Sequence, residues 1–172
     1  MMSVRAFRES RLLGLVGLFF VCALLPGVAV ASPAAEAALP RPSAELQPGD
    51  VVQIVIDALA NNERPFPDAG IETAYNFASP TNRETAGSLD RFATLVKGPV
   101  FGMMINHRDS NLSQVVVEGD KALRLVQIIA ADNETWYYAF RLGLQQDGDY
   151  AGMWLTEAVW PLENPADDML AI

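Results

Sequence analysis

The spacing of apolar residues divides the chain into a helical first half and an extended second half. Apolar positions recur three and four residues apart in three segments between Pro48 and Val96, as on a helix face that packs against a core. Beyond Pro99 they alternate with polar positions, which is typical of strands. The sequence therefore predicts helices followed by a sheet.

The first predicted helix begins at Pro48 and ends before Asn61. Proline suits the first helical position, where the N–H that it lacks has no partner, and Asp50 complements the positive helix N-terminus. The β-branched run at 51–56 is also compatible with a strand, but the start signal and the length favour a helix. The apolar face comprises Val52, Val55, Ile56 and Leu59.

Two further helices are predicted on either side of a turn at residues 81–87. Asp68 is well placed to cap the first of them, with its carboxylate accepting a hydrogen bond from a free amide. Ser-Pro at 79–80 ends this helix, because the residue before proline avoids the α region. Ser88 caps the next helix, which Gly-Pro at 98–99 stops. The apolar faces are Ile71, Ala74, Tyr75 and Ala78, and Leu89, Phe92, Ala93 and Val96.

The second half predicts four or five antiparallel strands, joined by short polar turns. The candidate segments are residues 100–105, 112–117, 121–131, 135–144 and 150–160. Residues 106–111 form a polar loop and Glu118-Gly119-Asp120 is a hairpin signal. The segment 121–131 is apolar on both faces, which is compatible with cover on both. Helices packed on one face of an antiparallel sheet make an α+β fold.

The first 31 residues have the pattern of an export signal. Arginines at 5, 8 and 11 precede the apolar run 12–25, and Ala29-Val30-Ala31 is a small-residue cleavage site. The run is shorter than the roughly 20 apolar residues of a transmembrane helix. We expect cleavage between Ala31 and Ser32, no stable membrane insertion afterwards, and a periplasmic or secreted protein; an uncleaved anchor is the alternative.

Cleavage would leave 141 of the 172 residues and lower the formal net charge from −9 to −11, because three arginines and one glutamate are lost. So acidic a surface argues against nucleic-acid binding, which depends on Lys and Arg contacts to phosphates. The only cysteine, Cys22, lies within the signal, so the mature chain has no disulfide. We expect a flexible linker at 32–47, a single α+β domain at 48–162 and a tail at 163–172.

Three motifs suggest a family: A-L-A-N-N-E-R-P-F-P-D-A-G-I-E-T-A-Y-N-F-A-S-P-T-N-R at 58–83, G-S-L-D-R-F at 87–92 and G-M-W-L-T-E-A-V at 152–159. Over about residues 48–160 the chain resembles the family called domain of unknown function 4864. The resemblance implies a cone-shaped, cystatin-like fold typified by nuclear transport factor two, and no known activity. The chain departs from the family at 86–89 and at Met153, which puts in doubt any role for a Thr hydroxyl or a thiol there.

Titratable candidates are few. His107 is the only histidine and the natural general base, although a solvated position in the polar loop is the alternative. Asp68 is either a structural helix cap or a cavity acid or base. A single histidine without cysteines does not make a usual zinc site, and no carboxylate motif is present. We predict no metal and no cofactor.

Binding candidates come from the third helix and the strands. Arg91 is placed either to pair with a carboxylate such as Asp68 or to bind a ligand anion. Asn82 lies in the S-P-T-N turn, where it satisfies local backbone groups. Trp136, Tyr138, Phe140 and Trp154 either line a pocket or belong to the core. The sequons at Asn111 and Asn133 matter only in a eukaryotic secretory pathway.

Three hypotheses of function follow. The first is a non-catalytic exported domain that binds a small, partly apolar ligand or a protein partner through a cavity or the sheet face. The second is a homodimeric structural or interaction module that pairs through the sheet face. The third, by analogy of fold alone, is a cavity hydrolase, isomerase or dehydratase that uses Asp68 and His107.

Overall fold

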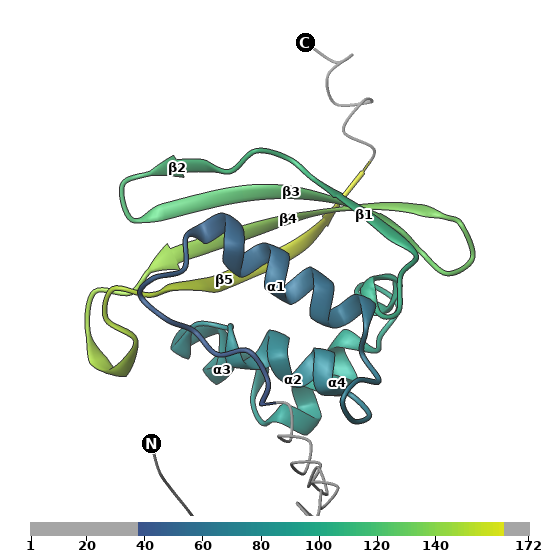
Figure 1. The fold of residues 1–172 in the computed structure, drawn as a ribbon, viewed down its shortest axis with the longest axis horizontal. Coiled ribbons are helices and arrows are strands. Elements are labelled where there is room, and N and C mark those ends of the chain that lie inside the picture. The colour runs from purple at the N-terminus through teal and green to yellow at the C-terminus, as the bar shows by residue number, and fades with distance from the viewer. Residues whose placement is uncertain (1–37, 164–172) are drawn as a thin grey trace, which may run out of the picture. The chain divides into compact units, whose positions relative to one another are not determined.

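The computed structural model describes residues 38–163, where four helices pack on one face of a five-stranded antiparallel sheet (Figure 1). This arrangement confirms the predicted α+β class; the cone-shaped, cystatin-like class stays a prediction. The signal peptide and most of the tail lie outside the described residues. The helices are α1 (Pro48–Ala60), α2 (Ala69–Asn76), α3 (Pro80–Ala86) and α4 (Leu89–Val96). The strands are β1 (Asp109–Leu112), β2 (Val116–Glu118), β3 (Lys121–Ile129), β4 (Thr135–Leu144) and β5 (Trp154–Leu162), with 3₁₀ turns η1 (Gly102–Met104) and η2 (Gly148–Tyr150).

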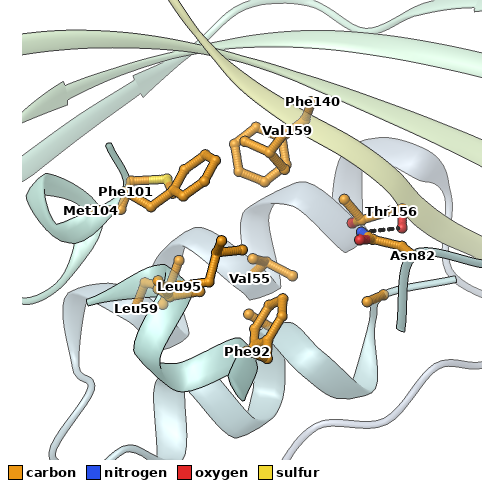
Figure 2. A pocket seen from close by; sticks show the side chains of 13 residues that line it. Val55, Leu59, Asn82, Phe92, Leu95, Phe101, Met104, Phe140, Thr156 and Val159 are labelled. Carbon is orange, nitrogen blue, oxygen red and sulfur yellow. Dashed lines mark hydrogen bonds between the residues drawn. The ribbon is translucent and has the colours of Figure 1, made fainter. Parts of the chain in front are cut away.

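The sheet is centred on β3 and β4. β4 pairs with β5 on its other side, and β1 and β2 both pair with β3, so that they share one edge. A bulge in β5 leaves Glu157 without a partner, because Arg141 faces Ala158 and Leu142 faces Thr156. The bulge changes the phase of the alternation, so that Thr156 and Val159 both lie on the helix side of the sheet (Figure 2).

The core lies between the helices and the inner face of the sheet. Leu123 and Leu125, on the other face of β3, are each 38% exposed, so the described residues cover only one face of this strand. No helix in the described part of the chain combines the length and apolar character needed to span a bilayer. The largest fully buried apolar side chains of the core are Tyr138, Phe77, Phe140, Ile56, Ile71, Ile128 and Leu142.

Several local predictions are wrong. The segment 112–117 is not one strand, because residues 113–115 separate β1 from β2, and the segment 150–160 becomes a strand only at Trp154. Residues 81–87 form no simple turn, since α3 occupies Pro80–Ala86. Ser79 caps this helix, with its Oγ accepting a hydrogen bond from the Asn82 N–H at 3.2 Å, and Pro80 takes the first helical position. The Ser-Pro pair that was predicted to end α2 is therefore the start of α3, and α2 already ends at Asn76.

The apolar run at 100–105 is not a strand. It consists of turns and η1, and β1 begins inside the predicted polar loop. Phe101 and Met104 still pack against the core, and the carbonyl of Val100 accepts a hydrogen bond from the Tyr138 hydroxyl at 2.9 Å. Burial of these side chains therefore explains the apolar run without strand pairing.

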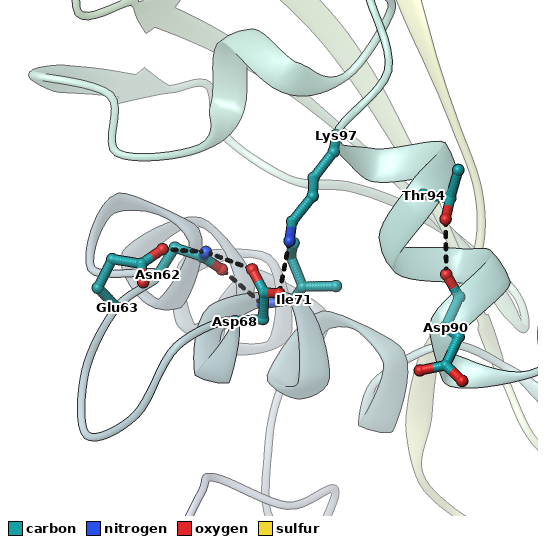
Figure 3. Close-up of polar contacts among 7 residues, drawn as sticks. All are labelled: Asn62, Glu63, Asp68, Ile71, Asp90, Thr94 and Lys97. Carbon is teal, nitrogen blue, oxygen red and sulfur yellow. Dashed lines mark hydrogen bonds and ion pairs between the residues drawn. The ribbon is translucent and has the colours of Figure 1, made fainter.

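One buried side chain, Asn62, connects α1 to α2 (Figure 3). Asn62 is 1% exposed. Its Oδ1 accepts a hydrogen bond from the Ile71 N–H at 3.0 Å. Its Nδ2 donates to Asp68 Oδ1 at 3.0 Å and to Glu63 Oε1 at 2.9 Å. Its own backbone N–H donates to Asn106 Oδ1 at 3.2 Å. We refer to these five residues as the Asn62 cluster.

Close approach of the two helices requires Gly70. A Cβ at this position would lie 2.2 Å from the carbonyl oxygen of Ala58. At this close approach, the Gly70 N–H donates a hydrogen bond to the carbonyl of Asn62 at 3.3 Å. The motif P-D-A-G-I therefore has a structural explanation, because its Asp, Gly and Ile all contact Asn62.

We expect Asn62→Ala to lower the free energy of unfolding by about 3 kcal/mol, because it leaves the buried Ile71 N–H without an acceptor and removes a donor from Asp68. Urea denaturation measures this loss. Asn61→Ala is the control: Asn61 is exposed, and within the described residues its side chain donates only to the Asp57 carbonyl, so a change within about 0.5 kcal/mol is expected. Equal effects of the two substitutions would contradict the structural role of Asn62.

Candidate functional site

A cleft of about 100 Å³ lies between the helices and the sheet (Figure 2). Two of its lining residues, Asn82 and Thr156, are polar, and none has a titratable side chain. The apolar lining residues are Val55, Leu59, Ala74, Ala78, Phe92, Leu95, Val96, Phe101, Met104, Phe140 and Val159. This composition is typical of a small-molecule site, whereas the volume is below the roughly 300–1,000 Å³ of pockets that enclose drug-sized ligands.

The cleft is built by segments that are distant in the sequence. Val55 and Leu59 are contributed by α1, one turn apart, and Phe140 by the inner face of β4. Phe101 comes from the turn after α4. Leu95 on α4 is 53% exposed, so it lies where the cleft meets solvent.

The polar end of the cleft is fixed by backbone hydrogen bonds around Thr156. Its N–H donates to the Phe77 carbonyl at 2.8 Å, and its carbonyl accepts from the Ser79 N–H at 2.9 Å and from Asn82 Nδ2 at 3.2 Å. The segment after α2 thereby forms a short parallel bridge with β5 through Ala78. The Thr156 hydroxyl is buried and has no hydrogen-bond partner among residues 38–163.

Comparison with known proteins identifies the family. The model described as Domain of unknown function (DUF4864) matches residues 44–169. The chain belongs to this family. No curated protein and no solved structure matches it. In this DUF4864 domain, the motif segments 58–83 and 152–159 are the ones that meet at Thr156.

The predicted binding residues are distributed over different parts of the domain. Asn82 lines the cleft. Tyr138 is fully buried in the core, and burial raises the pKa of its hydroxyl to about 12. Trp136 and Trp154 are partly buried against the core and do not line the cleft. Thr156 was not predicted, although the strand alternation places it on the same side of β5 as Trp154.

Arg91 lies on the exposed side of α4, one turn before Leu95. Together with Asp90 and Thr94 it borders a shallow hollow that is separate from the cleft and shares only Leu95 with it. The predicted pair between Arg91 and Asp68 is wrong. Lys97 at the end of α4 pairs with Asp68 instead, with Nζ 2.5 Å from Oδ2 (Figure 3).

Asp68 precedes α2 as predicted, but its side chain makes no capping hydrogen bond. Its backbone is left-handed, with φ of 64°, and its two oxygens accept from Lys97 and Asn62. The hydrogen bond from Lys97, followed by that from Asn62, lowers the pKa of the Asp68 carboxyl. Asp68 is therefore an ionised structural residue at neutral pH and lies outside the lining of the cleft.

His107 is buried, so the alternative of a solvated position in the polar loop is wrong. Its Nδ1 lies 2.7 Å from the carbonyl oxygen of Met104, so this ring nitrogen is hydrogen-bonded to the backbone. It does not line the cleft, and within the described chain no hydrogen bond or ion pair joins it to Asp68. The structure therefore does not bring the two candidate catalytic residues together.

We expect Lys97→Met to raise the pKa of the Asp68 carboxyl toward the value of about 3.9 for an unstructured aspartate, with the Asn62 hydrogen bond keeping it lower. A carboxyl pKa lowered by folding adds stability above the unfolded pKa, and this is lost as pH falls through the folded pKa. The stability difference between wild type and Lys97→Met should therefore shrink in that acidic window.

Carbon-detected NMR titration of the Asp68 carboxyl measures this pKa directly. Lys121→Met is the matched control, because it removes a lysine that pairs with Glu157 at 2.7 Å instead. It should leave the Asp68 titration unchanged. An unaltered Asp68 pKa in Lys97→Met would show that the pair does not form in solution.

Proposed function

We propose that this DUF4864 domain binds a small, largely apolar ligand in the cleft and does not catalyse a reaction. The observation that carries the proposal is the apolar cleft of about 100 Å³, which meets solvent at Leu95. An apolar cavity of about 150 Å³ binds benzene, so an open cleft of this smaller volume suits at most one six-membered ring, partly at the mouth, or one branched aliphatic group. A single ring, or the end of a longer ligand, is therefore the expected occupant.

The groups around the cleft support binding without catalysis. General acid–base catalysis needs a titratable group within hydrogen-bond reach of the substrate. In the part of the chain that the structure describes, no such side chain lines the cleft. Asp68 pairs with Lys97 outside it, and His107 contacts the Met104 carbonyl.

Toluene, a single substituted ring, tests the cleft. We expect saturable shifts of the NMR methyl signals of Val55, Leu59 and Val96 on titration of wild type with toluene. Ala74→Leu adds three carbons to the cleft wall and should weaken toluene binding at least roughly tenfold, at a stability cost of about 1–3 kcal/mol.

Thr94→Leu is the control for Ala74→Leu. It adds a leucine on the exposed side of α4, outside the cleft, and should leave toluene affinity unchanged. The proposal fails if wild type shows no saturable shifts, or if Ala74→Leu binds toluene as well as wild type does.

We propose, as a second candidate, that the outer sheet face pairs with a second copy of the chain after export. Leu125, Ala139 and Trp160 are direct neighbours across three strands, and Val116 lies beside Leu123. Four of these five side chains are exposed apolar groups, with Ala139 beneath them. A face of this kind suits a two-fold contact, in which the same patch occurs on both copies.

Native mass spectrometry of the chain expressed with its own N-terminus in an export-competent bacterium tests this candidate. If the chain is exported and cleaved, the subunit has the mass of residues 32–172. If it pairs, the observed species has twice that mass. Leu125→Asp should halve the observed mass, because it places a charge in the centre of the contact, whereas Thr94→Asp on α4 should not. A wild-type monomer at micromolar concentration would exclude the pairing, and an uncleaved N-terminus would exclude the processing.

A further inference from the structure

We infer that the cleft selects an uncharged ligand with a hydroxyl group, an alcohol or a phenol, which binds at Thr156 and Asn82. This inference rests on the proposed function and specifies the class of ligand. Thr156 is only 5% exposed, yet its Oγ1 has no partner in the described part of the chain although it lines the cleft. The Oγ1 atom itself has almost no accessible surface, so a ligand reaches it only when the side chains around it move apart. Buried hydroxyls are nearly always hydrogen-bonded, and a ligand hydroxyl would then supply the missing partner.

The Thr156 hydroxyl is held in place independently of any ligand. Three hydrogen bonds to Phe77, Ser79 and Asn82 fix the backbone on both sides of its Cα. Threonine is branched at Cβ, which restricts rotation of its side chain. A ligand therefore meets a positioned group and loses little free energy in ordering it.

Asn82 supplies a second, complementary group at the same end of the cleft (Figure 2). Its Nδ2 donates to the Thr156 carbonyl at 3.2 Å, which fixes the orientation of the amide. Its Oδ1 accepts no hydrogen bond from residues 38–163 and is an acceptor. A ligand hydroxyl can donate to Asn82 Oδ1 and accept from Thr156 Oγ1, whereas a carbonyl can only accept.

The remaining lining excludes charged ligands. A carboxylate, phosphate or ammonium group would lose its hydration on entry, and the cleft offers no side chain of opposite charge. Away from Thr156, the aromatic rings of Phe92 and Phe101 and the side chain of Leu95 provide only apolar contact. A small apolar molecule with one hydroxyl group therefore fits both ends of the cleft.

Phenol and toluene test this selectivity, because they differ by a hydroxyl in place of a methyl group of similar size. The readout is the ratio of the toluene Kd to the phenol Kd, measured by NMR titration. Thr156→Val makes the same exchange in the protein. We expect it to lower the ratio about tenfold, the effect of one hydrogen bond to a buried group.

Two more variants complete the test. Thr156→Ser keeps the hydroxyl and should keep the ratio within about twofold of wild type, since the hydrogen bond is retained. If Thr156→Val fails to fold, loss of the phenol preference in Thr156→Ser would overturn the inference by itself. Thr94→Val, on the exposed side of α4, should leave the ratio unchanged.

The outcomes separate the inference from the proposed function. If wild type binds neither probe, the cleft is not a ligand site and both fail. If wild type binds both probes and Thr156→Val leaves the ratio unchanged, the selection of a hydroxyl is wrong and apolar binding stands. A fall in the ratio in Thr156→Val alone supports the assignment to Thr156.

Discussion

The buried amide of Asn62 sets the relative positions of the helices on which the cleft depends. It accepts from the backbone of α2 and donates to Asp68 and Glu63, and the backbone N–H of Asn62 donates to Asn106 Oδ1 in the turn before β1. Gly70 allows the approach, since any larger residue would overlap the carbonyl of Ala58. One helical side of the cleft is therefore specified by polar groups that never contact its interior.

The sheet side depends on the bulge in β5. Glu157 is the extra residue, and its carboxylate lies 2.7 Å from Lys121 Nζ and 3.6 Å from Arg141 Nε on the outer face. Gly143 makes room for it, because a Cβ there would lie 2.1 Å from Glu157 Oε1. The bulge directs Thr156 and Val159 to the same face, so one residue of irregular pairing brings the hydroxyl and an apolar wall into the same cleft.

The sequence predicts those features that depend on residues close together in the chain, such as helix starts and tight turns. Pro48 and Ser88 mark the beginnings of α1 and α4 where the structure has them, and the hairpin at Gly119 joins β2 to β3 as expected. Helix α3 was missed because Ser79-Pro80 was interpreted as a helix end, whereas it is the start of α3. Of the cleft's two polar residues, Asn82 was a candidate and Thr156 was not. The position of Thr156 in the cleft lining comes from contacts with residues 77–82 and from the bulge, and neither leaves a local pattern in the sequence.

The family motifs and the cleft lining overlap only in part. The residues of P-D-A-G-I and F-A-S-P-T-N support the Asn62 cluster and the backbone around Thr156, so these motifs describe how the cleft is built. Leu95, Phe101 and Met104, which shape its apolar end, lie outside the motifs. It follows that the motifs account for the frame and the polar end of the cleft, whereas the size and shape of its apolar end depend on residues outside these motifs.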